Sequence, residues 1–591
     1  MHVAHTLNHA RASHSFAEQR QWRFSIVILF ILCTAIIIIA RLAVLQVARH
    51  GDYQALARGQ HETLEELVPQ RGTIYAQNKD TRYPLAINRA YSMAYAVPRD
   101  VTDSEKTVII LTSVLGLDEQ VVREKISKPD DLFEILKHRL SPEEERRLTE
   151  SNLDGIHLSP EYFRYYPGGE LAAQVVGFVG SDGQEYRGRY GMEASFENTL
   201  HGQKGVLQQE RAAGGGWISI GDRLLMPAQD GPDILLTINY PVQYEVERIL
   251  RAAVETHRAD SGSAVVLSPQ DGKIIAMASV PSFNPNNYNT VEDIARFVNP
   301  IVSHAYEPGS VFKPITMAIG IDHGVVTPDT TYVDTGQVVE AGYTITNAEG
   351  KVYGKSTMTN VLEESINTGV IHVEKLLGNT VFADYVRQFG FGEKTGIALP
   401  GESPGNMRNL AETKRDIQFF TASFGQGISV TPLQLAVAYG ALANGGVLMT
   451  PQIVEKMTYA DGREDSIAPQ QRQRVIREET ARTMGEMLRN VVVNGHGKRA
   501  DVPGYRVGGK TGTAQVAKSD AKGYDDGVTI GTFAGYAPLD DPRFVVVVKI
   551  DNPKDVIWAE SSAAPTFGKI MRYLLQYYDV PPTEPYDGPQ S

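Results

Sequence analysis

The chain has 591 residues, of which 42% are hydrophobic and 21% are charged, a composition typical of a folded protein with two to four domains. Its formal net charge is −13 and no long basic run offsets it, which argues against a nucleic-acid-binding protein. The single cysteine, Cys33, excludes an intrachain disulfide, and the fourteen histidines show no HExxH spacing, so a zinc enzyme is not expected.

An uncharged apolar segment lies near the N-terminus. Residues 24–40 read FSIVILFILCTAIIIIA, and the apolar character continues through LAVLQV, which is long enough for the roughly 20 residues of a membrane-spanning helix. A signal peptide is the alternative, but its apolar core is usually about 7–15 residues long and ends at a small-x-small cleavage site. The apolar segment of this chain is longer, and RLAVLQVARH, which follows it, offers no convincing cleavage site. We therefore predict a cytoplasmic tail at residues 1–23 and an uncleaved anchor at residues 24–44. Arginines flank the segment on both sides, so a cytoplasmic N-terminus is favoured only weakly by charge.

Residues 45–235 are mixed and polar. AYSMAYAVP predicts a short strand, SPEEERRLTESN predicts a helix, and the glycine-rich GGGW interrupts any regular element. This mixture of short strands and helices predicts a separate α+β domain that precedes the rest of the chain.

Residues 236–580 predict an α/β domain with an antiparallel sheet. ILLTI is strand-like, PVQYEVERILRAAVETH has helical periodicity, and AVVLS and KIIAMASV flank the turn sequence PQDG as a hairpin. Three more strands follow about 220 largely helical residues, in RVGGKTGTAQV, TIGTFAGYAP and RFVVVVKI. PTFGKIMRYLLQYY predicts a closing helix, and residues 581–591 a disordered tail. Strands at both ends of a helical insertion indicate one central sheet with a helical subdomain beside it.

Ser310 and Lys313 form an SxxK tetrad in YEPGSVFKP. Pro308 and Gly309 predict that a helix begins at Ser310, where the helix dipole favours developing negative charge. The lysine then lies one turn away on the same face, and apolar neighbours lower a lysine pKa toward the range of a general base. The alternative is that Ser310 is an N-cap and Lys313 a surface charge. A second tetrad, Ser519 to Lys522, lies in a polar stretch and is interpreted as a surface loop.

Ser365 and Asn367 form an SxN motif in EESINTG. A serine and an asparagine two residues apart can project to one side of a tight turn. Ser365 could relay a proton, while Asn367 could hold the lysine and accept a substrate amide. Ser282 and Asn284 have the same spacing in the turn-rich PSFNPNNYN, which predicts a structural loop.

Lys510, Thr511, Gly512 and Thr513 form a KTGT motif inside the strand-like RVGGKTGTAQV. A strand edge offers ordered N–H groups to an extended substrate, and glycines let a ligand approach the backbone. A second KTG begins at Lys394, but Pro and Gly follow it and predict a loop. We therefore assign the function to Lys510.

The three motifs in this order occur together in serine β-lactamases and penicillin-binding proteins, and the chain resembles a class B penicillin-binding protein. The resemblance includes RGTIYA, RYYPGGELAAQVVGFVG and GMEASFENTLHGQKG in the first domain. In the second it includes GSAVVLSPQDGKIIAMAS, FGQGISVTPLQLAVAYGALANGG and GGKTGTAQ. It implies a dimerisation-type pedestal over residues 45–235 and a penicillin-binding transpeptidase fold over residues 236–580. The chain departs from the usual pattern at AQNKDTRYP, at Asn299-Pro300-Ile301 and at Ile366, and none of these departures removes a catalytic group.

The resemblance implies a serine acyltransferase. Ser310, deprotonated by Lys313, attacks the penultimate D-alanine of a stem pentapeptide, and Ser365 passes a proton to the D-alanine that leaves. The N–H groups of Ser310 and Thr513 form the oxyanion hole, Lys510 supplies positive potential, and Thr511 and Thr513 bind the terminal carboxylate. No metal or organic cofactor is implied.

The resemblance also implies partners and a location. The protein acts outside the plasma membrane on peptidoglycan stem peptides, reacts covalently with penicillins, and works with a multispanning FtsW-like glycosyltransferase. Overall the chain looks more like the division type, FtsI, than the elongation type, MrdA. A β-lactamase, a β-lactam receptor and a catalytically silent division scaffold are the alternatives.

Overall fold

The computed structural model describes residues 6–50, 62–128, 131–181, 186–210, 224–411, 415–517 and 524–585. It divides into two compact units, Met1–Pro69 with Gln203–Gln229, and Gln70–Gly202 with Asp230–Ser591. The GGGW stretch and the second SxxK tetrad, with Ser519 and Lys522, lie outside the described residues.

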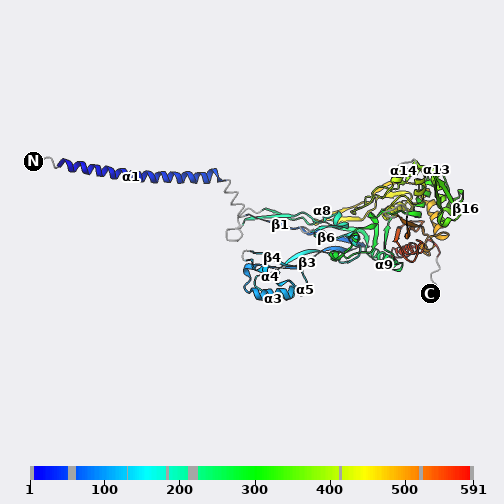
Figure 1. Ribbon diagram of the computed structural model, residues 1–591, viewed down its shortest axis with the longest axis horizontal. Helices are drawn as coiled ribbons and strands as arrows, with labels where there is room; N and C mark the ends of the chain where they lie inside the picture. The colour runs from blue at the N-terminus through cyan, green and yellow to red at the C-terminus, as the bar shows by residue number, and fades with distance from the viewer. Residues whose placement is uncertain are drawn as a thin grey trace. The chain divides into compact units, whose positions relative to one another are not determined.

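The first unit contains the predicted anchor. Helix α1 (Thr6–Ala43) continues into a π-helical turn, η1 (Val44–Ala48), and Figure 1 shows α1 as one long helix. Phe24–Ala48, which includes the end of α1 and all of η1, is the one span among the described residues that is long and apolar enough to cross a membrane. The unit also holds an antiparallel sheet of β1 (Glu62–Leu67), β8 (Gly205–Glu210) and β9 (Leu224–Met226).

The second unit contains a seven-stranded mixed sheet that joins distant parts of the chain. Its order is β19-β18-β10-β2-β3-β4, and β5 pairs with β3. The strands are β2 (Ile74–Asn78), β3 (Thr81–Ala96), β4 (Glu134–Leu140), β5 (Ile156–Tyr165), β10 (Asp233–Asn239), β18 (Val454–Thr458) and β19 (Glu464–Ser466). Because β10 pairs with β2 on one side and β18 on the other, the expected domain boundary at residues 235 and 236 falls inside a shared strand.

Helices cover one face of this sheet in the pedestal. They are α3 (Ser104–Leu115), α4 (Glu119–Ile126) and α5 (Pro142–Ser151), and Val108, Leu111 and Val122 bury against Leu136 of β4. The predicted α5 is confirmed. It begins with a capping box in which the Ser141 side chain accepts from the Glu144 N–H and the Glu144 carboxylate accepts from the Ser141 N–H.

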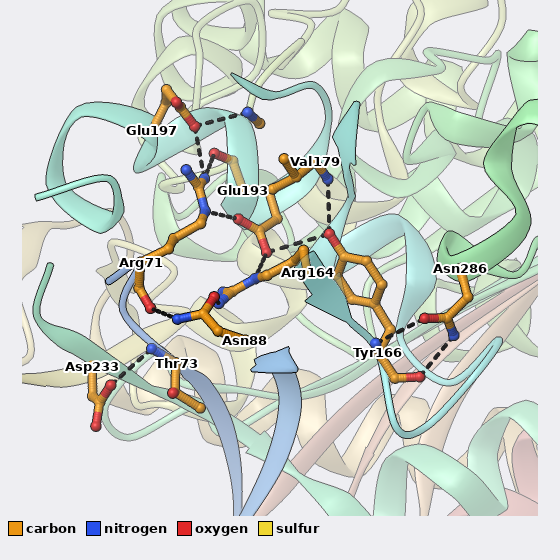
Figure 2. Close-up of polar contacts among 11 residues, drawn as sticks. Arg71, Thr73, Asn88, Arg164, Tyr166, Val179, Glu193, Glu197, Asp233 and Asn286 are labelled. Atoms are coloured by element: carbon orange, nitrogen blue, oxygen red, sulfur yellow. Dashed lines mark hydrogen bonds and ion pairs between the residues drawn. The ribbon is translucent and has the colours of Figure 1, made fainter. Parts of the chain in front are cut away.

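The pedestal also has a buried charged core, which the sequence did not predict (Figure 2). Glu193, on α7 (Gly191–Ser195), is fully buried. Its carboxylate accepts from Arg71 Nε at 2.7 Å and from Arg164 Nε at 2.6 Å, and Glu197 Oε2 lies 2.7 Å from Arg71 Nη2. Burial alone would lower the pKa of Arg71, but Glu193 and Glu197 raise it. Each charge in this core therefore has a partner of opposite sign.

Tyr166 connects the charged core to the second domain. Its hydroxyl donates to Glu193 at 3.4 Å, while its backbone N–H donates to Asn286 Oδ1 and its carbonyl accepts from Asn286 Nδ2, both at 2.9 Å. Asn286 lies on η3 (Pro285–Thr290), which Asn284 caps. Asn284 belongs to the second SxN triplet, Ser282 to Asn284, which we interpreted as a structural loop. Its role as a cap agrees with that interpretation.

The predicted central antiparallel sheet is confirmed, and it has five strands; the strand-like ILLTI, in β10, belongs to the seven-stranded sheet instead. The order of the five strands is β12 (Ile274–Val280), β11 (Ser261–Leu267), β23 (Phe544–Asp551), β22 (Tyr524–Ala537) and β21 (Gly508–Ala517). The predicted helices α9 (Tyr240–Thr256) and α18 (Ala563–Tyr577) pack on one face, and α16 (Pro432–Ala443) packs on the other. Because β21 is an edge strand, one side of the KTGT motif remains free of sheet pairing.

The predicted helical subdomain lies between β12 and β21. Its main helices are α11 (Lys313–Asp322), α12 (Met358–Glu363), α13 (Asn367–Leu377), α14 (Asn379–Gln388), α15 (Asp416–Ser423), α16 and α17 (Glu478–Val493). At the C-terminus, the Thr583 N–H donates to Gly504 O at 2.9 Å and Arg489 pairs with Glu584 at 2.8 Å. These contacts attach Thr583 and Glu584 to the domain, while the predicted tail beyond residue 585 lies outside the described residues.

Candidate active site

A cavity of about 250 Å³ brings the three motifs together. Five of the eight predicted site residues line it: Ser310, Ser365, Asn367, Thr511 and Thr513. The other three, Lys313, Lys510 and Gly512, are buried. The structure therefore joins, in one site, residues that are up to 203 positions apart in the sequence.

Ser310 lies in a 3-10 turn, η5 (Gly309–Phe312), and α11 begins only at Lys313. The chain is therefore helical from Gly309, close to the predicted start at Ser310, but its first turn is a 3-10 turn and not an α-helical one. Pro314 takes up a first-turn position of α11, where proline is favoured. Pro308 and Phe312 occupy the two N-cap positions without a side-chain cap. The N-cap alternative for Ser310 is excluded, and Ser310 is half-buried at the cavity wall.

Lys313 is fully buried and is held by Ser365. Its Nζ donates to Ser365 Oγ at 3.1 Å and to the Ser365 carbonyl. Ser365 has a φ of 56°, a left-handed conformation that non-glycine residues rarely adopt, and it presents both oxygens to the lysine. Burial, and then the charge of Lys510, hold the pKa of Lys313 well below its usual value. These contacts suit a lysine that accepts a proton at neutral pH.

Asn367 does not make the contact that we expected with Lys313. Its Nδ2 donates instead to the Thr346 carbonyl at 2.9 Å. Asn367 is the first residue of α13, directly after Ile366 in the N-cap position, so its side chain is fixed at the cavity wall while Ser365 holds the lysine.

Lys510 is fully buried on the edge strand β21, and its Nζ donates to the Thr511 carbonyl at 3.1 Å. Burial lowers its pKa to about 7. Gly512 packs directly against the turn that carries Ser310, because a Cβ there would lie 2.9 Å from Pro308 O and 3.0 Å from Val311 N. Glycine is therefore required for the strand to approach the turn that carries Ser310.

The second KTG is a closed structural loop. Thr395 is buried, and its N–H and hydroxyl both donate to Glu402 Oε1, while the Gly396 N–H donates to Glu402 Oε2. Lys394 is exposed. The choice of Lys510 over Lys394 agrees with this arrangement.

Other residues line the cavity that the motifs did not reveal. They are Gly309, Ala348, Glu349, Lys351, Tyr353, Glu364, Phe424, Gln426, His496, Trp558 and Glu560. His496 Nδ1 lies 3.3 Å from Glu560 Oε2, and the Ala559 N–H donates to Thr513 Oγ1 at 3.1 Å. Most of these residues lie on loops far from any motif. Two of them have positions that could have indicated them: Gly309 directly precedes Ser310, and Glu364 directly precedes Ser365.

Comparison with known families accounts for both domains. The penicillin-binding protein transpeptidase domain matches residues 262–572, and the penicillin-binding protein dimerisation domain matches residues 66–236. The chain belongs to the class B penicillin-binding proteins. The predicted family and fold are thereby confirmed, and this penicillin-binding protein carries the family's transpeptidase domain after its pedestal.

Individual relatives cover nearly the whole penicillin-binding protein. Stage V sporulation protein D of Bacillus subtilis is 34% identical over 568 residues, covering 95% of this chain and 86% of the relative. Peptidoglycan D,D-transpeptidase FtsI of Escherichia coli is 30% identical over 578 residues, covering 95% and 92%. Among solved structures, penicillin-binding protein 3 from Mycobacterium tuberculosis, complexed with aztreonam, is 30% identical with a TM-score of 0.67, covering 88% of this chain and 99% of that chain.

Proposed function

We propose that this penicillin-binding protein is a peptidoglycan D,D-transpeptidase of the division septum and that Ser310 carries its acyl-enzyme. The observation that supports the chemistry best is the contact between buried Lys313 and Ser365 in the same site as Ser310. Lys313 has no carboxylate partner among the residues that the structure describes, and a lysine with a lowered pKa can accept the proton of a serine hydroxyl.

These contacts support the following first half-reaction. Lys313 takes the Ser310 proton as Oγ attacks the carbonyl of the penultimate D-alanine, and the N–H groups of Ser310 and Thr513 stabilise the oxyanion. The proton then passes from Lys313 through Ser365 to the nitrogen of the terminal D-alanine as the C–N bond breaks. Thr511 and Thr513 hold the carboxylate of the leaving residue, and the charge of Lys510 favours its binding.

In the second half-reaction, an amine from a neighbouring stem peptide attacks the ester on Ser310. A C–N bond forms, the C–Oγ bond breaks, and the amine proton returns through Ser365 and Lys313 to Ser310. Penicillins place a strained amide on the same serine. Acylation by a β-lactam therefore reports the first half-reaction alone.

The full-length chain in detergent with a fluorescent penicillin and a D-alanyl-D-alanine pentapeptide tests this chemistry. We expect a stable adduct on Ser310, and release of D-alanine with amide formation when an amine is present. Rapid hydrolysis of the adduct would instead indicate a β-lactamase.

The division role is supported by the resemblance to FtsI over 95% of this chain. The relative from Bacillus subtilis has a sporulation name, and an elongation role of the MrdA type is the further alternative. We propose that α1 anchors the protein in the plasma membrane with its N-terminus in the cytoplasm. The catalytic domain then lies outside, where an FtsW-like glycosyltransferase supplies glycan strands.

Depletion of the protein in its own cells tests this role. Filamentous cells without septa are the expected result, whereas rounded cells would indicate elongation and a defect confined to spores would indicate sporulation. A Ser310→Ala copy that restored division would show that the protein serves as a catalytically silent scaffold.

A further inference from the structure

Three carboxylates line the catalytic cavity, and they differ in their partners. Glu349 Oε2 lies 2.9 Å from Lys351 Nζ, and Glu560 Oε2 lies 3.3 Å from His496 Nδ1. Glu364 is exposed to solvent at the cavity wall, and in the described part of the chain its carboxylate has no ion pair or hydrogen bond. Lys351, whose pKa is raised mainly by Glu349 and more weakly by the charge of Glu364, is bonded to Glu349 and leaves the Glu364 carboxylate without a direct partner. Glu364 is therefore the carboxylate of the cavity that is available to a cationic ligand.

The position of Glu364 relates it to a particular step of the reaction. Ser365, the next residue, contacts Lys313 at 3.1 Å and lies on the proposed proton path to the leaving nitrogen. The second half-reaction is the chemical reverse of the first with a different amine. By microscopic reversibility, the incoming amine therefore occupies the place beside Ser365 that the leaving amine vacated.

We infer that Glu364 binds the ammonium group of the incoming stem peptide and is a specificity determinant for cationic acceptors. The inference rests on the proposed function. An amine is protonated at neutral pH, so the acceptor arrives as a cation, and an unpaired carboxylate at the cavity wall attracts it. Water and neutral nucleophiles receive no such attraction, so Glu364 favours cross-linking over hydrolysis.

Atoms and charge balance in this sequence. The bound ammonium first loses one proton to solvent. The neutral amine then attacks the acyl carbon on Ser310, the C–N bond forms and the C–Oγ bond breaks. One of the two protons of the neutral amine passes through Ser365 and Lys313 to Ser310 Oγ, and the other stays on the nitrogen of the new amide. Glu364 positions the cation and does not take part in bond making, so it is a positioning residue.

The test measures how the acyl-enzyme partitions between nucleophiles. The full-length chain in detergent micelles is given a D-alanyl thioester donor, with either methanol or a tripeptide whose third residue carries a free side-chain amine. The ratio of transfer product to hydrolysis product is measured for the native chain and for Glu364→Gln, Glu364→Asp and Glu560→Gln. Glu560→Gln is the matched control, because it removes a carboxylate of the same cavity that already has a partner.

The expected result for Glu364→Gln is a fall in amine transfer relative to hydrolysis of about fivefold, through a higher KM for the amine, as suits one partly exposed ion pair. Methanol transfer and the rate of penicillin acylation stay unchanged. Glu364→Asp recovers part of the amine transfer, and Glu560→Gln matches the native chain.

Three results would overturn the inference. One is an unchanged amine partition in Glu364→Gln, and a second is an equal loss with methanol, which would show a general defect in the acyl-enzyme. The third is an equal loss in Glu560→Gln, which would show that only the net charge of the cavity matters. Failure of the native chain to react with penicillin would contradict the proposed function itself.

Discussion

The pedestal and the active site both bury charged side chains, but they treat them in opposite ways. In the pedestal, Glu193 lies within 2.7 Å of two arginines, so its charge is balanced where it is buried. In the active site, Lys313 and Lys510 are equally buried, and in the described part of the chain neither contacts a carboxylate.

This difference separates structural from chemical use of a buried charge. A paired charge keeps its ionised form, and removing one partner leaves the other uncompensated in the interior. An unpaired lysine instead lowers its pKa until the neutral form is populated, as burial does to Lys313 and Lys510. Breaking the pedestal core should therefore cost stability, whereas the proposed catalytic role of the two lysines requires a burial that is itself destabilising.

Replacing Lys313, the proposed general base, should give the largest effect, which is on the rate of acylation. Lys313→Met is expected to slow penicillin acylation by about 10²–10⁴-fold, the usual contribution of a general base. The same variant should melt at a higher temperature, because methionine fills the site without a polar group that must be desolvated. Stopped-flow acylation and thermal unfolding measure the two effects, and the exposed Lys394→Met is the control. A lower melting temperature in Lys313→Met would contradict the comparison.

Breaking the ion pairs of Glu193 should instead lower the stability of the protein and leave the rate of acylation unchanged. Glu193→Gln leaves Arg71 and Arg164 without their shared carboxylate, and we expect a loss of about 3–5 kcal/mol in the free energy of unfolding. Molecules that remain folded should still be acylated by penicillin at the native rate. Urea unfolding provides the measurement, and Glu150→Gln, which breaks an exposed pair with Arg146, should have a far smaller effect. Equal losses in the two variants would show that burial of the pair is unimportant.

Glu374 extends the comparison to an unpaired acid. It is fully buried on α13, and neither carboxylate oxygen has a hydrogen-bond partner in the described structure. Burial, and then the charge of Asp416, raise its pKa to about 8.

Since the folded pKa of Glu374 lies above the unfolded value, the protein should lose stability as pH rises from about 4.5 to about 8. Glu374→Gln should remove this part of the pH dependence and stabilise the protein at pH 8 by about 1–3 kcal/mol. Thermal unfolding at several pH values measures the effect, with the exposed Glu255→Gln as control. A destabilised Glu374→Gln would show that the carboxyl group has a stabilising partner.

The smallest expected effect concerns the shape of the pH profile. The acylation rate should fall at low pH, where Lys313 becomes protonated, and should fall again above about pH 7, where Lys510 loses its charge. Lys510→Arg keeps a positive charge at all these pH values, so it should abolish the alkaline limb and retain the acid limb. An alkaline limb that persisted in Lys510→Arg would assign that ionisation to another group.

The elements with strong local patterns were predictable from the sequence. Alternation, periodicity and turn residues predicted the strands of the five-stranded sheet and the helices α5, α9 and α18. They also favoured Lys510 over Lys394. The shared sheet through β10 was not predictable, because its partners β2 and β18 lie more than 150 residues away on either side. Strand pairing over such distances leaves no local pattern.

The site was predicted in its members but not in all its contacts. Ser310 and Ser365 line one cavity and Lys313 contacts Ser365, but the 3-10 turn at Ser310 and the bond from Asn367 to Thr346 depend on tertiary packing. The partners of Glu193 and the cavity residue Glu560 lie on separate loops and strands, and only the folded chain brings them together.

The most direct test of the assignment of Ser310 is intact-mass and peptide analysis of the full-length chain after reaction with a fluorescent penicillin, beside Ser310→Ala and Ser519→Ala. We predict one stable adduct per chain on the peptide that contains Ser310, absent in Ser310→Ala and unchanged in Ser519→Ala. An adduct that persisted in Ser310→Ala would contradict the assignment of the nucleophile.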